Sequence, residues 1–289
     1  MSDHTLYQKP EGSGQQETSE IKEQLQNIIR KNRPLYPKAH QLPSSLVLSL
    51  TSYPPRFATL PLTLECLLSQ TVQPDHFILW IAESDREQLT DEILSFTEQG
   101  LEIRYCEDIK AYKKLIPSLR QFPESFIVTA DDDVYYWPTW LEELVTSWSG
   151  EDKEIVAHSA YTVELDNGGQ PRPCPEWSWG IKGDIEQAKQ SGLNFATGGG
   201  GILYPPGSLP EEVLDSETFQ ELAPHNDDIW LYWMSRRHGS KVKAIRPECK
   251  MPTWFGSQQT ALRNYNIKQN GDDEQVANML NSYGFPENE

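Results

Sequence analysis

Several features that would assign a protein to a familiar class are missing from this sequence. No apolar run approaches the roughly 20 residues of a membrane-spanning helix, and the N-terminus has no apolar segment of the kind found in secretion signals. The four cysteines lie far apart without a C-x-x-C spacing, which argues against a zinc site or a disulfide framework: Cys66, Cys106, Cys174 and Cys249. We therefore expect a soluble, cytoplasmic protein with no transmembrane segment and with buried free thiols.

Positive charge is also scarce. Lysine and arginine together number 25 against 43 aspartates and glutamates, which gives a formal net charge of −18. A protein that binds nucleic acid needs a basic face for the phosphate backbone, so no nucleic acid is expected as a partner. The same deficit disfavours broad adhesion to anionic membrane, although peripheral membrane association stays open.

A nucleoside-triphosphate loop is absent as well. The glycine run Gly198–Gly201 lacks the G-x-x-x-x-G-K-[ST] spacing and the helix that should follow it. Four consecutive glycines indicate instead that a flat ligand, such as a sugar ring, approaches the backbone closely. A bulged strand explains the run equally well.

The composition is that of a globular protein. The chain has 289 residues, of which 37% are hydrophobic and 10% aromatic, enough for a full core. Residues 1–20 are rich in Gly, Ser, Gln and Glu and are expected to be disordered, and a helix is predicted at 19–31. We divide the chain into an N-terminal extension, partly disordered (1–44), a single domain (45–265), and a C-terminal helix and tail (266–289).

Strands and helices alternate through the first half of the domain. Helices are predicted at 59–69, 86–99 and 112–121, and strands at 46–52, 76–81, 101–105 and in the apolar run before the acids at 131–133. Gly100 is expected to end the second helix. This alternation predicts an α/β fold with a right-handed, Rossmann-like, mostly parallel central sheet flanked by helices. Ligands bind outside the carboxyl ends of such strands, which places four loops on one rim: 51–56, 82–84, 107–108 and 131–133.

The pattern changes after Trp148. A strand is predicted at 155–163, with a turn at 166–169 that closes a hairpin. The acidic sequence 226–228 opens an amphipathic helix that ends at Gly239. A last strand is predicted at 241–245 and a final helix near 272–282.

The most informative motif is the row of three acids at the end of the fourth strand. Adjacent carboxylates repel one another and lose hydration at a strand end, so a cation or a set of donors must offset the cost. Asp131 and Asp133, two positions apart, are able to point toward one divalent ion, and Mg²⁺ or Mn²⁺ suits carboxylate ligands. The alternative is an acidic turn in which Asp132 or Asp133 caps a helix that starts at Trp137 and Pro138.

Taken in chain order, the motifs resemble those of a GT-A-fold glycosyltransferase. They are Thr51–Arg56 after the first strand, Lys114 before the fourth, Asp131–Asp133 at its end, the glycine run, and Asn226–Asp228. The nearest similarity is to the bacterial family-2-like enzymes that build surface polysaccharide, and it covers about residues 45–265. The resemblance implies a transferase that moves a sugar from a nucleotide-sugar donor, with a UDP-sugar favoured, to a glycan hydroxyl.

The resemblance also implies roles for the donor side of the site. Asp131 and Asp133 would hold Mn²⁺ or Mg²⁺ against the donor diphosphate, stabilising the charge of the leaving group. The remaining donor-binding residues would be Thr51, Ser52, Arg56, Lys114, Asp132, Gly199 and Gly200. For the loop after the first strand the alternative is an ordinary Pro-Pro turn, and for Lys114 it is a solvated helix face shared with Lys113.

The acid pair at 227–228 matches the family's catalytic position, although the family often has Glu at the first place. The second acid, Asp228, would then be the base that deprotonates the acceptor, supported by Asp227, with inversion at the sugar. A like-charged neighbour raises the pKa of one acid of a pair, which suits a base working near neutrality. The alternative is that Asn226 or Asp227 simply caps the helix.

Other functions stay open at this point. A retaining transferase on the same fold would use Asp228 only to position the acceptor, and a non-catalytic relative would bind sugar without turnover. A phosphotransferase with Asp131 as nucleophile is disfavoured, because its acid should follow the first strand of the domain. The candidate histidines for a metal shell are His158, His225 and His238. The candidate tryptophans for stacking on sugar are Trp177, Trp179 and Trp254, although core packing is commoner for tryptophan.

Overall fold

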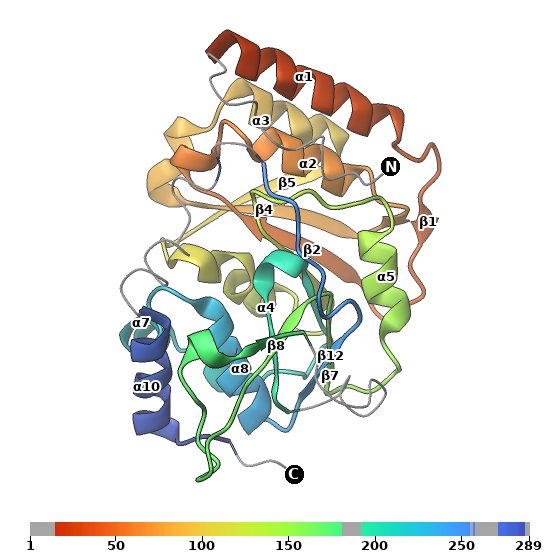
Figure 1. Ribbon diagram of the computed structural model, residues 1–289. Helices are drawn as coiled ribbons and strands as arrows, with labels where there is room; N and C mark the ends of the chain where they lie inside the picture. The colour runs from red at the N-terminus through yellow and green to blue at the C-terminus, as the bar shows by residue number, and fades with distance from the viewer. Residues whose placement is uncertain (1–14, 181–191, 255–256, 258–270, 287–289) are drawn as a thin grey trace.

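The structure is a computed structural model that describes residues 15–180, 192–254, 257 and 271–286. Its centre is a seven-stranded sheet in the order β12-β7-β11-β6-β2-β4-β5 (Figure 1). The strands are β2 (Leu46–Thr51), β4 (His76–Ala82), β5 (Leu101–Cys106), β6 (Phe126–Ala130), β7 (Glu154–Ala157), β11 (Ile202–Tyr204) and β12 (Lys241–Ala244). Neighbouring strands are parallel except where β11 pairs with β6 and β7. The predicted mostly parallel α/β sheet is confirmed.

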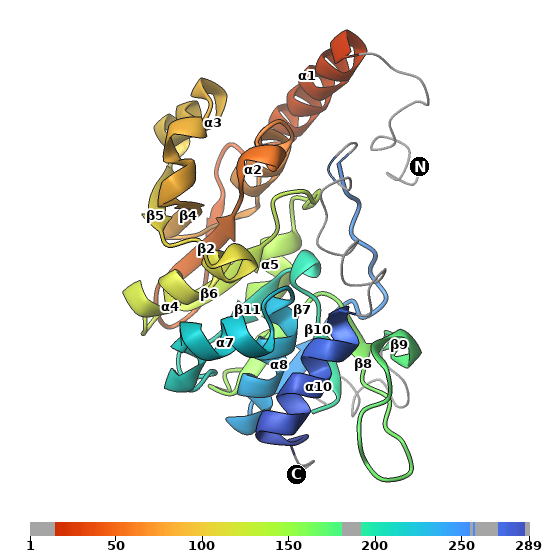
Figure 2. The same ribbon diagram turned by 90° about the vertical axis from the view of Figure 1, so that its left-hand side faces the viewer.

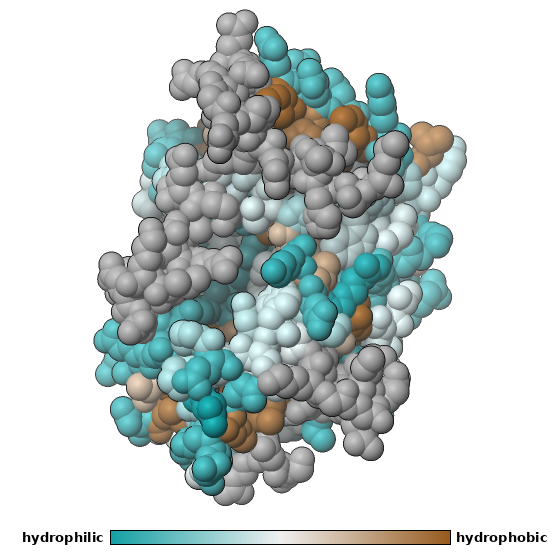
Figure 3. Space-filling model, in the orientation of Figure 1, coloured by the Kyte–Doolittle hydropathy of each residue, from teal (hydrophilic) through white to brown (hydrophobic). Residues whose placement is uncertain are grey.

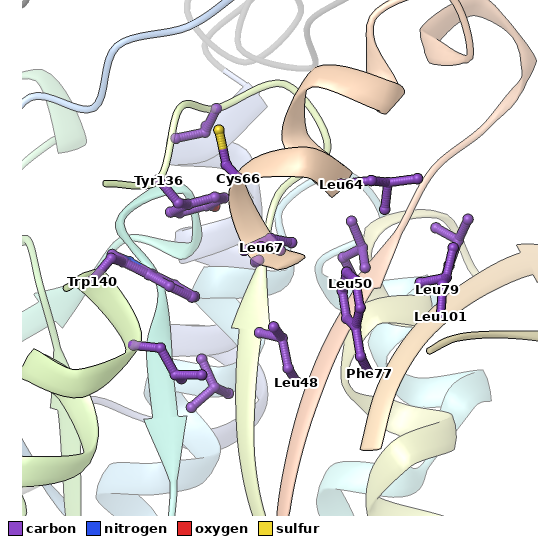
Figure 4. Packing of buried hydrophobic residues seen from close by; sticks show 14 of the residues in the cluster. Leu48, Leu50, Leu64, Cys66, Leu67, Phe77, Leu79, Leu101, Tyr136 and Trp140 are labelled. Atoms are coloured by element: carbon purple, nitrogen blue, oxygen red, sulfur yellow. The ribbon is translucent and has the colours of Figure 1, made fainter. Parts of the chain in front are cut away.

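Successive side chains of the strands enter two separate hydrophobic clusters, because neighbouring residues of a strand point to opposite faces. In β2, Leu48 and Leu50 belong to the first cluster and Val47 to the second. Burial on both faces explains why β2 and β4 have almost continuous apolar sequences. Figure 4 shows part of the first cluster, where Leu48 and Leu50 lie close to Leu67 of a covering helix.

Helices cover both faces of the sheet (Figure 1, Figure 2). The first cluster is closed by α1 (Gln15–Lys31), α2 (Leu60–Leu68), α3 (Asp91–Ser95) and α5 (Trp140–Ser147). The second cluster is closed by α4 (Ile116–Gln121), α7 (Ser216–Leu222), α8 (Asp227–Arg237) and α10 (Gly271–Tyr283). The predicted helices at 59–69, at the 226–228 motif and near 272–282 are therefore present, as is the last strand.

Short elements complete the fold. β1 (Lys38–Ala39) pairs with β3 (Val72–Gln73), and a small sheet has the order β10-β8-β9, formed by Asn194–Ala196, Ala160–Thr162 and Ser178–Trp179. Three 3₁₀ segments lie at the site described below: η2 (Pro54–Arg56), η5 (Lys110–Lys114) and η7 (Gly198–Gly200). Two others are η6 (Cys174–Glu176) and η8 (Glu211–Leu214).

Two predicted helices are broken in the structure. The segment 86–99 consists of η3 (Glu83–Gln88), α3 and η4 (Phe96–Gln99), because Leu89 and Thr90 are extended and the Thr90 side chain caps a new helix at α3. Gly100, with φ of 102°, ends this region as predicted. The segment 112–121 divides into η5 and α4, since Pro117 in the first turn of α4 cannot donate a hydrogen bond to the preceding turn.

The single strand predicted at 155–163 is also wrong. The chain leaves the large sheet after β7 and enters the small sheet as β8, and the change occurs at His158 and Ser159. The His158 amide donates to the Gly201 carbonyl, whereas the Ser159 carbonyl accepts from Thr197, so consecutive residues pair with different parts of the glycine segment. The predicted turn at 166–169 is present, closed by a bond from the Gly169 amide to the Asp166 carbonyl.

The helix predicted at 19–31 is α1, which begins earlier, at Gln15. Leu25 and Ile29 of α1 are buried in the first cluster, and Arg30 forms an ion pair with the buried Glu65 of α2. The domain boundaries at 44 and 265 stay predictions.

Among the described residues, no helix combines the length and the apolar composition that crossing a bilayer demands. All four cysteines are free, as predicted, but only Cys66 is fully buried. On the face seen in Figure 3, apolar residues of the described chain form separate patches, one of them over α1.

Candidate active site

The loops that follow β2 and β6 meet at the carboxyl edge of the sheet. These strands are parallel neighbours in register, with Leu50 opposite Ala130. The Ser52 hydroxyl donates to Oδ2 of Asp132 at 2.5 Å, and Arg56 forms an ion pair with Asp133. The prediction that 51–56 and 131–133 share one rim is confirmed.

Arg56 lies under the acids rather than on an exposed turn. Arg56 is 6% exposed, and its Nη1 lies 2.5 Å from Asp133 Oδ2 and 3.8 Å from Asp132 Oδ1. Burial alone would lower the pKa of Arg56, but the charges of Asp132 and Asp133 outweigh it and raise the pKa. Pro54–Arg56 does form a turn, but Arg56 is buried in it and its guanidinium faces carboxylates.

Asp132 is held between a hydroxyl and two like charges. Burial is the main cause that raises its pKa, to about 7, and the neighbouring charge of Asp133 adds to it. Arg56 and the Ser52 hydrogen bond act in the opposite direction. This carboxyl is poised between its charged and neutral forms near neutral pH.

Lys114 joins the two acidic motifs. Its Nζ lies 2.9 Å from Asp131 Oδ1 and 3.1 Å from Asp227 Oδ2, although these acids stand on opposite sides of the glycine run in the sequence. The residue is 5% exposed. Burial would lower its pKa, but Asp131 and Asp227 raise the pKa well above the ordinary value, so the ammonium stays charged.

The backbone of Lys114 is fixed by the sheet. Its carbonyl accepts from the Ser49 hydroxyl of β2, which also contacts the Ser118 hydroxyl at 2.9 Å. Lys113, beside it, is equally buried but turns to Asp108 instead. A solvated helix face is therefore wrong for both lysines.

The acid pair stands at the first two positions of α8. The helix is capped by Asn226, whose Oδ1 accepts from the Asp228 amide at 3.1 Å, so capping is not the role of Asp227 or Asp228. Oδ2 of Asp228 accepts from the Gly198 amide at 3.0 Å, and within the described chain its buried Oδ1 has no hydrogen-bond partner. Burial first, and then the charge of Asp227, raises the pKa of Asp228 to about 7.

The glycine run lies between these acids and is packed by the protein's own side chains. A Cβ on Gly198 would lie 2.7 Å from Lys114 Nζ and 3.0 Å from Asp228 Oδ1. A Cβ on Gly200 would lie 2.3 Å from Ser159 Oγ. At Gly199 the nearest atom is Asp131 Oδ2, at 3.4 Å, which is ordinary contact. A Cβ on Gly201 would lie 2.2 Å from Trp140 Cζ2, so close packing explains three of the four glycines without a ligand. Donor contact at Gly199 and Gly200 stays a prediction.

Tyr136 is a member of the site that sequence reasoning missed. Its hydroxyl accepts from the Asp131 amide at 2.8 Å and donates to the Gly199 carbonyl at 3.2 Å, tying the acid loop to the glycine run. An aromatic residue among several after β6 gives no signal of this role in the sequence. The residue is buried against Trp140, which hydrogen-bonds Gly200.

Other predicted candidates are accounted for structurally. The helix α5 begins at Trp140 after Thr139, so neither Asp132 nor Asp133 caps it. Ring nitrogens of His158 and His238 bond backbone carbonyls of Trp140 and Gly207. Trp177 and Trp254 are buried core residues. The Thr51 hydroxyl donates to the Trp80 carbonyl within the sheet, and its contact with a donor stays a prediction.

The charge of the site suits a divalent cation, whereas the geometry favours only one of the two predicted ligands. Five carboxylates face two cationic side chains: Asp131, Asp132, Asp133, Asp227 and Asp228 against Arg56 and Lys114. Asp131 is the carboxylate that fits, because its side chain is 33% exposed. Asp133 is closed by Arg56, and among the described residues no three His, Cys, Asp or Glu side chains are arranged so that they could hold one metal ion.

Comparisons with known proteins give a similarity in shape alone. No protein-family model and no curated protein match the sequence. Similar solved structures include the mannosyltransferase PcManGT from Pyrobaculum calidifontis in complex with GDP-Man and Mn²⁺, with 10% identity, a TM-score of 0.47, and coverage of 93% of this chain and 73% of that one. Residues 1–349 of TarS from S. aureus have 13% identity and a TM-score of 0.43, with coverage of 82% of this chain and 72% of that one. GalNAc-T7 with UDP, GalNAc and Mn²⁺ has 10% identity and a TM-score of 0.46, with coverage of 96% of this chain and 68% of that one. At these values the similarities assign no family, and the functional conclusion rests on the site.

Proposed function

We propose that this protein is a metal-dependent glycosyltransferase of the GT-A type, which moves a sugar from a nucleotide-sugar donor to a hydroxyl of a glycan. The supporting observation is the meeting of two acidic motifs at Lys114, on the edge of the sheet where α/β proteins bind ligands. One motif suits a cation and a diphosphate, and the other offers a carboxyl with a pKa near neutrality.

The donor side is formed by the loops after β2 and β6. Asp131 is the carboxylate best placed to hold Mn²⁺ or Mg²⁺, and Asp133 would join it if Arg56 moved to the donor. The bound ion would stabilise the charge of the leaving nucleoside diphosphate. Ser52, Arg56 and Lys114 would orient the donor through charge-assisted hydrogen bonds, and a UDP-sugar is the favoured donor.

The acceptor side is formed by the start of α8. Asp228 has one buried oxygen without a hydrogen-bond partner among the described residues, and that oxygen would accept the proton of the acceptor hydroxyl once the bound acceptor reached it. A pKa of about 7 lets the group take a proton during the reaction and lose it again to solvent near neutral pH. Attack by the deprotonated hydroxyl on the face opposite the diphosphate gives inversion at the sugar. Within the cell, we place the reaction in the cytoplasm and in the synthesis of bacterial surface polysaccharide.

A panel of nucleoside diphosphates, each with and without Mn²⁺, tests donor binding by thermal shift. A specific site stabilises the fold by about 2.7 kcal/mol at a hundredfold excess of ligand over Kd. We expect UDP with Mn²⁺ to give the largest shift and Asp131→Asn to remove it. Absence of any nucleotide-dependent shift would contradict the proposal. Turnover then excludes a non-catalytic sugar-binding protein, and the product anomer, read by NMR, separates inversion from retention.

A further inference from the structure

The loop that carries the acid pair is held by the C-terminal helix. The backbone amides of His225 and Asn226 both donate to Oε1 of Gln275, at 2.8 Å and 3.0 Å. Gln275 lies on α10 and is 3% exposed, and its amide nitrogen donates to the Gly271 carbonyl at 2.9 Å. One side chain therefore satisfies two successive backbone donors directly before Asp227.

A second side chain continues this connection. Nδ2 of Asn226 donates to Asp272 Oδ1 of α10 at 2.9 Å, while Oδ1 of Asn226 accepts from the Asp228 amide. Asn226, which caps α8, is thus oriented by α10 on one side and bonded to the Asp228 amide on the other. Since the acids occupy the first turn of α8, the place where this helix begins sets the position of their carboxylates.

We propose that Gln275 is a positioning residue for Asp227 and Asp228, acting through the backbone of His225 and Asn226. The proposal rests on the proposed function, because it assigns that acid pair a part in sugar transfer. Without the acceptor oxygen, two partly buried donors lose their partner, and the loop must shift to bring them to water. Within the described residues, the hydrogen bonds of the Gln275 side chain reach His225, Asn226 and Gly271 and no residue of the loops after β2 and β6, so these donor loops should be unaffected.

The test compares two amides on the same helix. Gln275→Met keeps the volume of the side chain and removes the acceptor. The control is Asn278→Leu, which removes an α10 amide that donates to the Leu222 carbonyl, away from the acid pair. We expect Gln275→Met to lower kcat at least about 10-fold with donor KM within about 2-fold, because a displacement of about 1 Å is enough for such a loss. The control should keep kcat. Equal kcat values in the two variants would overturn the proposal.

Amide hydrogen exchange gives a readout that needs no activity. In the wild-type protein we expect the amides of His225 and Asn226 to be protected from exchange, since both are hydrogen-bonded to a buried side-chain oxygen. Gln275→Met should lose that protection and Asn278→Leu should keep it. Unprotected amides in the wild type would overturn the positioning role even if no variant folds. If exchange behaves as expected but the wild type transfers no sugar, the proposed function has failed and the link between α10 and the loop stands.

Discussion

The ammonium group of Lys114 lies 3.1 Å from the carboxylate of Asp227, on an element from the other half of the chain. The same ammonium contacts Asp131, so a single buried cation links the acid row after β6 to the acid pair of α8. Without it, these carboxylates would face one another across the glycine run. The organisation of the site therefore depends on Lys114.

Replacement of Lys114 tests this dependence. Lys114→Met should lower the free energy of unfolding by about 3–5 kcal/mol, because it leaves the buried carboxylate of Asp227 and the partly buried carboxylate of Asp131 without their partner. The adjacent Lys113→Met is the matched control: its partner Asp108 is 58% exposed and can be hydrated, so we expect a loss of about 1 kcal/mol or less. Denaturant unfolding measures both. Similar losses in the two variants would show that Lys114 contributes only packing.

Asp228→Asn tests the base. The group acts only in the transition state, so we expect kcat to fall about 10²–10⁴-fold with little change in donor Kd. Since Asn226 caps α8, the loss cannot come from an uncapped helix. The variant should also be more stable than the wild type at pH 8, because it removes a buried charge beside Asp227. A kcat near the wild-type value would exclude the inverting mechanism proposed above.

The pH dependence of the wild-type rate follows from the same group. The pKa of Asp228 is raised to about 7, so the carboxylate that accepts the proton is depleted as the pH falls below 7. We expect kcat/KM to rise with pH up to about 7 and then to level off. Rates measured across this range for wild type and Asp227→Asn provide the comparison. Removal of the like charge at 227 should shift the rising limb to lower pH, and an unmoved limb would contradict the coupling between the two acids.

The metal assignment is tested by two variants of the acid row. If one ion is shared, Asp131→Asn and Asp133→Asn should both abolish the stabilisation by Mn²⁺ and UDP. The structure adds a second expectation, that Asp133→Asn destabilises the apo protein, because Arg56 loses the carboxylate on which its Nη1 rests. Thermal shift with and without Mn²⁺ measures both effects. Retention of the metal-dependent shift in Asp133→Asn would limit the ligand role to Asp131.

His158 predicts a loss of stability in acid. Burial lowers its pKa to about 4, and hydrogen bonding to the Trp140 carbonyl and the charge of Glu143 oppose this only partly. In the unfolded state the pKa of this histidine is near 6.5, so as the pH falls the unfolded chain binds the proton before the folded protein does. The contribution of neutral His158 to the free energy of unfolding is therefore fully present above pH 6.5 and falls by about 3 kcal/mol toward pH 4. His158→Gln should remove this part of the slope in denaturant unfolding at pH 4, 5.5 and 7. An identical slope in the variant would assign the acid sensitivity to other groups.

The sequence determined the features that depend on neighbours along the chain. Apolar runs buried on both faces predicted β2, β4 and β6, and their alternation with helices predicted a mostly parallel sheet with the acid row at its carboxyl edge. Asn226 gave a local capping signal for α8, and Gly100 gave one for the end of the second helical region. Such signals are readable because hydrogen bonding and side-chain direction repeat over a few residues.

Only the tertiary structure decided which charges meet. Nothing local distinguishes Lys114, which faces the acids, from Lys113, which turns to Asp108, or shows that Arg56 rests on Asp133. Likewise, Tyr136 and Gln275 carry no motif, and their hydrogen bonds exist because β6 lies beside β11 and α10 lies beside α8. Partners far apart in the sequence are selected by strand order and helix packing, and the low dielectric of the buried site then makes each ion pair specific.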